Sequence, residues 1–265
     1  MAERPRDSWV GGDAYESYVG RWSRRVAGVF LAWLAIPPGA SWLDVGCGTG
    51  ALSQAILATA APRAVHGVDP SESFVAYARQ HAQDTTAAFT VGDAQALPVD
   101  SDSVDAVVSG LVLNFVPDPA RAVAEFARVT RPGGTIAAYV WDYAGQMQLM
   151  RVFWDAAVAL DPAALAFDEG ARFPVCRPAP LAALFRGAGL RDVETRPIDV
   201  PTVFKDFDDY WSPFLSGKAP APAYAISLRE DRRAALRERL RGALPTNKDG
   251  SIDLIARAWA VRCHA

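Results

Sequence analysis

Residues 43–50 read LDVGCGTG, and this stretch decides the fold because it separates two segments of different character. The apolar run Ser41–Val45 predicts a buried strand, and the Ala- and Leu-rich run Ala51–Ala61 predicts a helix. Glycine permits positive φ and lets a ligand approach the backbone closely. The turn between strand and helix contains Gly46, Gly48 and Gly50, so one of its edges has no side chains. This favours a ligand site over a plain tight turn.

Short apolar runs alternate with helical segments after this turn. Strands are predicted at Ala64–Val68, Ala87–Val91, Val104–Ser109 and Thr135–Trp141, and helices at Ser71–Gln83 and Pro119–Val129. The strands lack polar–apolar alternation, as expected where helices cover both faces of a sheet. This order predicts a parallel sheet of the α/β class.

The second half of the chain is less regular. Further helices are predicted at Ala144–Leu160 and Pro178–Gly187, and a strand at Leu190–Val200. The segment Ser227–Glu230 has the pattern of a capping box, which should open the Arg-rich helix that follows it. In Ser251–Cys263 apolar residues recur at every second position, which is typical of an antiparallel strand.

Acidic residues stand at or near the predicted strand ends. Asp69 follows the second strand, where a carboxylate can accept two hydrogen bonds from a ribose diol. Asp44 precedes the turn and accepts hydrogen bonds either from backbone amides or from the ammonium group of a ligand, and the sequence leaves both open. Asp93 follows the third strand and can accept from an adenine amine, while Ala94 offers its backbone amide to the ring.

A nicotinamide dinucleotide is the rival ligand for this turn. Gly46, Gly48 and Ala51 satisfy the loose dinucleotide fingerprint, so an NAD(P)-dependent oxidoreductase is the alternative function. The polar segment Gly92–Pro98 argues against it, because a dinucleotide fold needs no such element after the third strand.

Composition disfavours several kinds of partner. The 265 residues are 51% hydrophobic with a net charge of −3, so neither nucleic acid nor an anionic membrane is an expected partner. The longest apolar run, Val26–Ile36, is shorter than the roughly 20 residues that span a bilayer, and Met1–Asp13 lacks the apolar core of a signal peptide. The three cysteines are Cys47, Cys176 and Cys263, which lie far apart and lack the spacing of metal ligands. We therefore expect no metal site and no disulfide, and a cytoplasmic location.

Several segments resemble, in order, the motifs of class I S-adenosylmethionine-dependent methyltransferases. They are Leu43–Gly50, Asp69, Gly92–Pro98, Val104–Asp118 and Arg131–Thr135. The resemblance is greatest to the small-molecule "type 11" group, which includes the ubiquinone and menaquinone biosynthesis methyltransferases, and it covers Ser41–Trp141. Residues 18–23, YVGRWS, resemble the N-terminal helix of several members.

This resemblance implies an α/β, Rossmann-like, doubly wound sheet. The sheet would be mostly parallel and seven-stranded, with an antiparallel last strand and helical cap insertions. The whole chain, 1–265, would form a single domain: an N-terminal helical cap at 1–40, a cofactor-binding core at 41–141, and the C-terminal half of the sheet with substrate-cap insertions at 142–265.

The resemblance also implies the cofactor, S-adenosyl-L-methionine, and a small-molecule methyl acceptor. The implied cofactor contacts are Gly46, Gly48 and Gly50 to the methionine part, Asp69 to the ribose, Asp93 and Ala94 to the adenine, and Ser109 to Leu111 beside the reacting methyl group. Members often carry histidine where this chain has Asn114 and Phe115, which removes a candidate base.

Methyl transfer from a sulfonium displaces an activated leaving group in line, so positioning and desolvation can supply most of the rate. A base is needed only for an acceptor that is protonated at neutral pH. No catalytic residue is assigned, because His66 lies within a predicted strand, His81 late in a helix and His264 at the tail. A second rival is a non-catalytic protein that binds the cofactor, and the intact glycine turn with its set of acids counts against it.

Substrate contacts should come from segments beyond the fourth and fifth strands and from the N-terminal helix, because ligands bind at the carboxyl ends of parallel strands. Aromatic residues crowd the second half of the chain, and the candidates for an acceptor lid are Trp141, Tyr143, Tyr210 and Trp211. The candidates for closing over the cofactor are Tyr18, Arg21 and Trp22.

Overall fold

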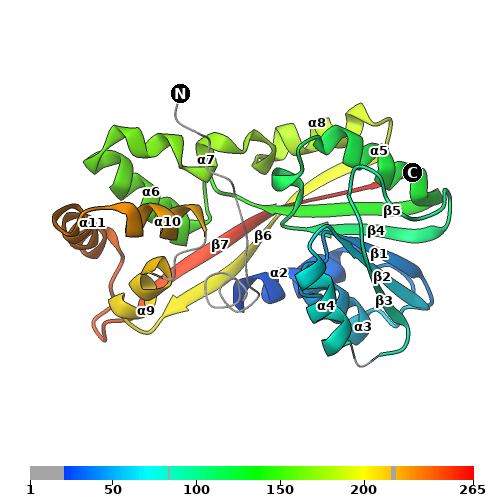
Figure 1. Cartoon of the computed structure of the whole chain (residues 1–265), viewed down its shortest axis with the longest axis horizontal. Coiled ribbons are helices and arrows are strands. Elements are labelled where there is room, and N and C mark those ends of the chain that lie inside the picture. The colour runs from blue at the N-terminus through cyan, green and yellow to red at the C-terminus, as the bar shows by residue number, and fades with distance from the viewer. Residues whose placement is uncertain (1–20, 83, 216–218) are drawn as a thin grey trace. The chain divides into compact units, whose positions relative to one another are not determined.

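The computed structural model describes residues 21–82, 84–215 and 219–265. Its strands form a seven-stranded sheet of order β3-β2-β1-β4-β5-β7-β6 (Figure 1). The strands are β1 (Ser41–Val45), β2 (Ala64–Asp69), β3 (Ala87–Val91), β4 (Val104–Gly110), β5 (Thr130–Trp141), β6 (Arg191–Phe204) and β7 (Ile252–His264). The helices are α2 (Arg21–Leu34), α3 (Ala51–Thr59), α4 (Glu72–His81), α5 (Pro119–Val129), α6 (Gln148–Leu160), α7 (Glu169–Arg172), α8 (Pro178–Gly187), α9 (Phe207–Trp211), α10 (Pro220–Ser227) and α11 (Glu230–Ala243).

Parallel pairing joins β3, β2, β1, β4 and β5, as the sequence predicts. The register sets Val45 opposite Val68, and Asp44 opposite Val108. The carboxyl ends of β1, β2 and β4 therefore meet at one edge of the sheet, which is where open α/β sheets bind ligands.

The last strand is reversed, as expected. Backbone hydrogen bonds join Gly133 to Ala265 and Asp142 to Arg257, so β7 runs antiparallel to β5. Ion pairs from Arg257 to Asp199 and from Arg262 to Glu194 cross to β6 in the same reversed order. The sheet thus has six parallel strands and an antiparallel one, which lies between β5 and β6.

The chain is divided into two compact units. The sheet unit contains residues 23–140, 175–198 and 258–265. The cap unit contains residues 141–174, 199–257 and, at its described N-terminal end, 21–22. The expectation of a single domain over the whole chain stays a prediction.

Helices of the sheet unit bury an apolar face against the strands. In α5 the buried residues recur at helical spacing, and Asp118 caps the helix by accepting the Arg121 N–H, with Pro119 in the first turn. On α2, Phe30 packs with its ring centroid 4.7 Å from that of Tyr139 on β5. This ring contact joins α2 to β5.

Several predicted boundaries differ from the structure, and contacts explain the start of β5 and the start of α6. The strand predicted from Thr135 begins at Thr130 in β5, because Thr130 pairs with Val104. The residues predicted as a loop before Thr135 lie within the strand as an irregularity, where the register shifts. The helix expected from Ala144 begins at Gln148, because the Asp142 carbonyl accepts the amides of Gly145 and Met147 and folds these residues into a turn.

The predicted capping box is wrong. Ser227 is the last residue of α10 and donates its hydroxyl hydrogen bond to the Tyr224 carbonyl, so it does not cap the next helix. Glu230 pairs with Arg233 instead. The cause is the shortness of the link between α10 and α11, which the local sequence pattern does not reveal.

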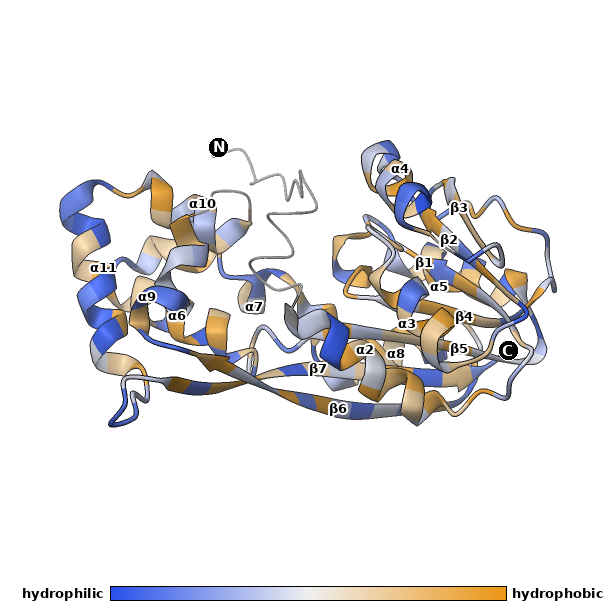
Figure 2. Ribbon diagram, turned by 90° about the horizontal axis from the view of Figure 1, so that it is seen from below, coloured by the Kyte–Doolittle hydropathy of each residue, from blue (hydrophilic) through white to orange (hydrophobic). Residues whose placement is uncertain are grey.

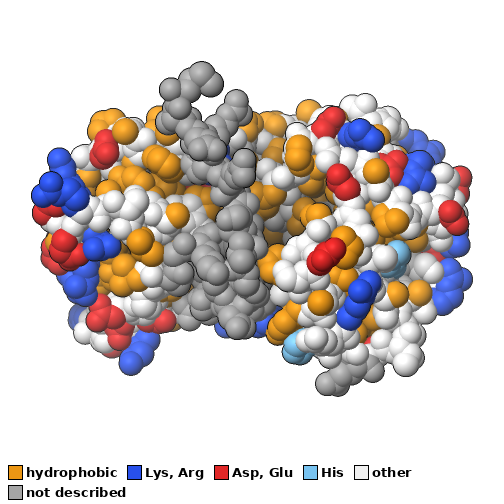
Figure 3. Space-filling view, in the orientation of Figure 1, with side chains coloured by type: hydrophobic (Ala, Val, Ile, Leu, Met, Phe, Trp, Pro, Cys, Tyr) orange, Lys and Arg blue, Asp and Glu red, His pale blue; other side chains and the backbone are white. Residues whose placement is uncertain are grey.

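The Arg-rich helix α11 presents charge to solvent. Its buried residues are Leu236 and Leu240, and the hydropathy colours of α11 are mainly hydrophilic (Figure 2). Basic and acidic side chains interleave over this helix, at the left edge of Figure 3. Such a mixture is typical of a solvated helix face rather than an anion-binding surface.

Across the described ranges, no helix is both long and apolar enough to cross a membrane. The same residues contain no group of three or more His, Cys, Asp or Glu side chains that could hold a metal ion. All three cysteines are buried thiols.

Candidate functional site

The glycine turn after β1 has the open backbone that its sequence predicts. Gly46, Gly48 and Gly50 all have positive φ, at 75°, 54° and 90°. A Cβ on Gly46 would lie 2.5 Å from a methyl carbon of Val112, whereas a Cβ on Gly48 would meet nothing within 4 Å. Gly46 is therefore required by packing, and Gly48 leaves free space beside the backbone.

The acid at the end of β2 fastens this turn. Asp69 Oδ2 accepts the Gly48 N–H at 2.9 Å, and Oδ1 accepts the Ser71 N–H at 2.9 Å. The carboxyl group is 7% exposed, and burial raises its pKa while these two amides oppose the rise. Two lone pairs remain for a ligand diol. The bond to Gly48 was not foreseen from the sequence, because only the register of β1 against β2 brings the two groups together.

Asp44 is a buried acid with an unused oxygen. Its Oδ2 accepts the Ser53 hydroxyl at 2.7 Å, and its Oδ1 is fully buried without a hydrogen-bond partner. Burial raises the pKa of Asp44 to about 7, and the negative charge of Asp69 adds to the rise. A cationic group beside Oδ1 would satisfy this atom and favour the ionised carboxylate.

Cys47 lies in the turn without the character of a nucleophile. Burial raises its pKa above the ordinary value of a thiol, and the carboxyl groups of Asp44 and Asp69 raise it further. A thiol that stays protonated is a small packing residue, as expected from the sequence.

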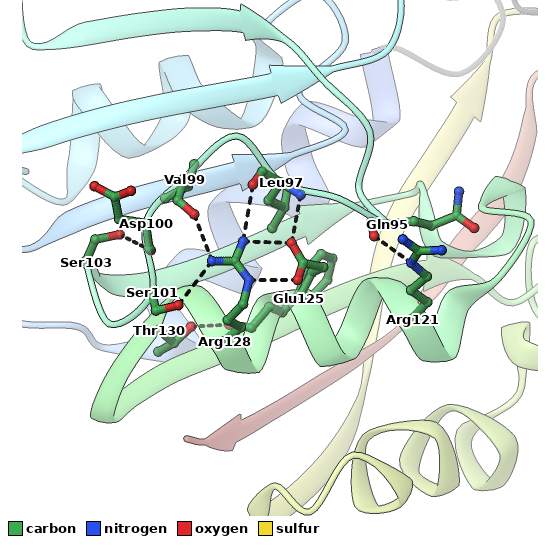
Figure 4. A network of polar contacts seen from close by, with 11 residues as sticks. Gln95, Leu97, Val99, Asp100, Ser101, Ser103, Arg121, Glu125, Arg128 and Thr130 are labelled. Atoms are coloured by element: carbon green, nitrogen blue, oxygen red, sulfur yellow. Dashed lines mark hydrogen bonds and ion pairs between the residues drawn. The ribbon is translucent and has the colours of Figure 1, made fainter.

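The segment after β3 presents the predicted adenine contacts. Asp93 is exposed, and Ala94 is 9% exposed. The Asp93 carboxylate accepts hydrogen bonds from the backbone and the side chain of Gln95. These bonds lower the pKa of Asp93. Side chains of α5 form hydrogen bonds to the backbone of Gln95, Leu97 and Val99 (Figure 4). Sequence reasoning missed this support, because it depends on how α5 packs.

The segment after β4 contains strain and unsatisfied polar groups. Leu111 has a φ of 64°, which is costly for a residue with a Cβ, and its N–H donates to the Tyr139 carbonyl at 2.7 Å. Asn114 is 8% exposed, and neither its side-chain nitrogen nor its oxygen has a partner. Such a group costs free energy unless something binds it. Val112, two residues before Asn114 in the chain, lies beside Gly46 of the glycine turn.

Ser109 faces away from Asp44. Asp44 is opposite Val108 in the register, so the next residue along β4 points to the other face of the sheet. Its hydroxyl is buried and has no partner. The structure therefore does not bring the side chains of these two candidates together.

The predicted lid aromatics lie in the cap unit as packed core residues. Trp141, Tyr143, Tyr210 and Trp211 are all buried. The Tyr210 hydroxyl donates to the Leu149 carbonyl at 3.0 Å, and burial raises its pKa. Of the N-terminal candidates, Tyr18 and the side chain of Arg21 lie outside the described residues. Trp22 is buried with its ring centroid 5.8 Å from that of Phe204.

The cap unit also buries acids that the sequence did not single out. Arg151 forms an ion pair with Asp168 at 2.7 Å, and Glu169 accepts the Trp154 indole N–H. Burial raises the pKa of Glu169 to about 7. No sequence motif marks these acids, because their partners Arg151 and Trp154 lie on α6 and are brought beside them only by the fold.

Comparison with known proteins finds a family that part of the sheet unit resembles. Residues 43–138, which hold the glycine turn, Asp69, Asp93 and Asn114, match the methyltransferase domain family. This segment is similar to methyltransferase domains. The match includes the segments whose resemblance to the "type 11" methyltransferases the sequence indicates, and the sheet has the fold expected of them.

Named enzymes are among the relatives of this chain. The chain is 33% identical to malonyl-[acyl-carrier protein] O-methyltransferase of Methylococcus capsulatus, over 59% of each chain. It is 37% identical to 2-methyl-6-phytyl-1,4-hydroquinone methyltransferase of Synechocystis, over 46% of this chain and 39% of that one. The chain spans 53 to 59% of the length of the first curated relatives that it matches.

A solved structure shares the fold of this chain. It is a putative methyltransferase from an antibiotic biosynthesis pathway of Anabaena variabilis, with a TM-score of 0.62 and 23% identity. The similarity covers 89% of this chain and 96% of that one. At this level of identity it bears on the fold alone.

Proposed function

We propose that the protein is an S-adenosylmethionine-dependent methyltransferase that acts on a small molecule. The observation that carries this proposal is the glycine turn, in which Gly48 leaves its backbone open while its N–H is held by Asp69. A turn of this kind, with acids at the neighbouring strand ends, fits an adenosyl amino acid.

The residues present fit the cofactor. The buried and partnerless Oδ1 of Asp44 suits the ammonium of the amino acid part, and the open turn at Gly46, Gly48 and Gly50 suits the methionine chain. Asp69 has lone pairs for the ribose, and Asp93 with the Ala94 amide is suited to adenine. The bound cofactor would supply a methyl group on a sulfonium, with a neutral thioether as leaving group.

The segment after β4 is proposed to face the reacting end of the cofactor. Leu111 is held in a left-handed conformation by its bond to Tyr139, which fixes the direction of the following residues. Ser109 contributes its backbone rather than its side chain to this segment, since its hydroxyl lies on the other face of the sheet.

The acceptor is proposed to be a small organic molecule. Two relatives are named for a hydroquinone and for a malonyl group on a carrier protein, and both are small acceptor groups. The net charge of −3 does not favour nucleic acid. The buried cap aromatics Trp141, Tyr143, Tyr210 and Trp211 are proposed to shape the acceptor region from within the cap unit.

A cytoplasmic location is part of the proposal. It rests on the cysteines, which are odd in number and are all buried thiols, as is usual in a reducing compartment.

Calorimetry on the purified full chain tests the cofactor, with S-adenosylhomocysteine, S-adenosylmethionine and NADH as separate titrants. We expect heat with the two adenosyl compounds and none with NADH. Incubation with methyl-labelled cofactor and a panel of hydroquinones, phenols, carboxylic acids and amines then tests transfer. Heat with NADH alone would identify an oxidoreductase, and binding without transfer to any member of the panel would favour a non-catalytic binder.

A further inference from the structure

One side chain links the proposed adenine contacts to the scaffold. The Gln95 backbone N–H donates to Asp93 Oδ1 at 2.9 Å, and the Gln95 side-chain amide donates to the same oxygen at 3.1 Å and to Oδ2 at 3.2 Å. An ionised carboxylate has about four lone-pair sites. These bonds use three of them and leave Oδ2 free to accept one further N–H.

Gln95 is itself held by the start of α5. Its side-chain oxygen accepts the Asp118 N–H at 3.1 Å, and its backbone carbonyl accepts the Arg121 Nε–H at 2.9 Å. Asp118 is the cap of α5, so the position of Gln95 follows the position of the helix.

The same helix holds the residues after Gln95. Glu125 accepts the Leu97 N–H at 2.8 Å, and Arg128 donates to the carbonyls of Leu97 at 3.2 Å and Val99 at 3.0 Å. Glu125 and Arg128 also form an ion pair at 2.7 Å (Figure 4). The three residues Arg121, Glu125 and Arg128 recur at i, i+4 and i+7, so they form one ridge of the helix.

Side chains of this ridge, rather than a neighbouring strand, form the hydrogen bonds to the backbone of Leu97 and Val99. A partly exposed ion pair contributes little by itself. Here its atoms accept the Leu97 N–H and donate to the carbonyls of Leu97 and Val99 in the segment that follows Gln95. An exposed carboxylate such as Asp93 normally samples several rotamers, and its bonds to Gln95 restrict that freedom.

We propose that Gln95 is a positioning residue of the cofactor site, which aims the Asp93 carboxylate at the exocyclic amine of adenine. The inference rests on the proposed function, because it requires that an adenine nucleoside binds. In this role Gln95 does not contact the cofactor itself. It links α5 to Asp93, so the position of the helix fixes the position of the carboxylate.

The test compares two ligands that differ only at the amine. The probes are S-adenosylhomocysteine and its 6-deamino analogue, in which hydrogen replaces the exocyclic amine. For the natural chain we expect the deamino analogue to bind about tenfold more weakly, as the loss of a hydrogen bond to a charged group implies. In Gln95→Leu this ratio should fall to about twofold, with little change in the affinity for the analogue.

Two further variants complete the experiment. Gln95→Glu keeps the length of the side chain but sets a second carboxylate beside Asp93, so the ratio should fall as well. Gln80→Leu changes an exposed glutamine on α4 and should leave the ratio unchanged. The melting temperature is recorded for each variant.

The outcomes separate the inference from the proposed function. A Gln95→Leu variant that loses affinity for both probes equally, or that keeps the natural ratio, overturns the positioning role. A natural chain that binds both probes equally overturns it too, while the proposed cofactor stands. If the natural chain binds neither probe, the proposed function is wrong and this inference falls with it.

Discussion

Asp69 Oδ2 accepts the backbone N–H of Gly48 at 2.9 Å, so the acid that ends β2 holds the turn that follows β1. The same carboxylate receives the Ser71 N–H and thereby helps to begin α4. The carboxylate that we propose binds the ribose is thus also a structural acceptor, and the two roles can be separated by experiment.

For Asp69→Asn we expect a loss of both stability and affinity. The asparagine retains one oxygen for two backbone donors, so the free energy of unfolding should fall by about 1–2 kcal/mol. The affinity for S-adenosylhomocysteine should fall at least about tenfold, since a charged acceptor for the ribose is lost. Asp105→Asn is the matched control, because Asp105 accepts the Ser41 N–H at 2.8 Å near the amino end of β4. Equal loss of affinity in both variants would contradict the ribose role.

The glycines of the turn should respond differently to alanine. Gly46→Ala would set a Cβ 2.5 Å from a Val112 methyl carbon at positive φ, which should cost about 2–4 kcal/mol of unfolding free energy in chemical denaturation. Adding Val112→Ala should restore part of this loss. If the double variant is no more stable than Gly46→Ala, contact with Val112 is not the reason for the glycine.

Gly48→Ala should affect binding more than folding. The added Cβ meets no protein atom within 4 Å, so only the strain of positive φ, about 1 kcal/mol, should appear in the unfolding free energy. It would occupy the space proposed for the cofactor and should weaken S-adenosylhomocysteine binding by at least about tenfold. Gly39→Ala carries the same strain, at φ 84° with open surroundings, and should leave the affinity unchanged. Matching affinities for the two variants would show that no ligand lies beside Gly48.

Asp44 should make both stability and binding depend on pH. Burial raises its pKa in the folded protein to about 7, against an ordinary value of 3.8. The folded state therefore holds this proton more tightly, and the stability that this provides at low pH is lost as the pH rises through about 7. The difference in unfolding free energy between the natural chain and Asp44→Asn should shift against the natural chain between about pH 4 and pH 7. The upper bound on that shift is about 4 kcal/mol.

If Asp44 receives the ammonium of the cofactor, the affinity for S-adenosylhomocysteine should rise with pH up to about 7, because the ionised carboxylate binds the cation. Ser53→Ala removes the hydroxyl that lowers this pKa, so the midpoint should move to higher pH. A binding constant that does not change across this range, or that changes equally in Asp44→Asn, would rule out this role.

Asn114→Leu should raise stability and lower activity. The buried amide has no partner, so an apolar side chain of similar size should leave the free energy of unfolding unchanged or raise it by about 1 kcal/mol. If the amide serves a ligand, methyl transfer should fall at least about tenfold at constant protein stability. Thermal unfolding and the transfer assay measure the two effects. Unchanged transfer would show that Asn114 is a tolerated packing defect.

The sequence by itself determined the elements whose information is local. Glycines at alternate positions between a strand and a helix, apolar runs without alternation, and Asp69 after β2 are readable because turn geometry, period and chain order depend on neighbouring residues. The antiparallel β7 was readable for the same reason, from apolar residues at every second position.

Tertiary structure alone decided the contacts between segments that are distant in the chain. The Val112 methyl carbons that require Gly46, the α5 ridge that forms hydrogen bonds to the backbone after Gln95, and the buried Oδ1 of Asp44 arise from strand register and helix packing. The capping box failed for a related reason, since Ser227 was already the end of α10. Hydrogen bonds and close packing act through space over a few ångströms, so their partners cannot be assigned until the register of the sheet is known.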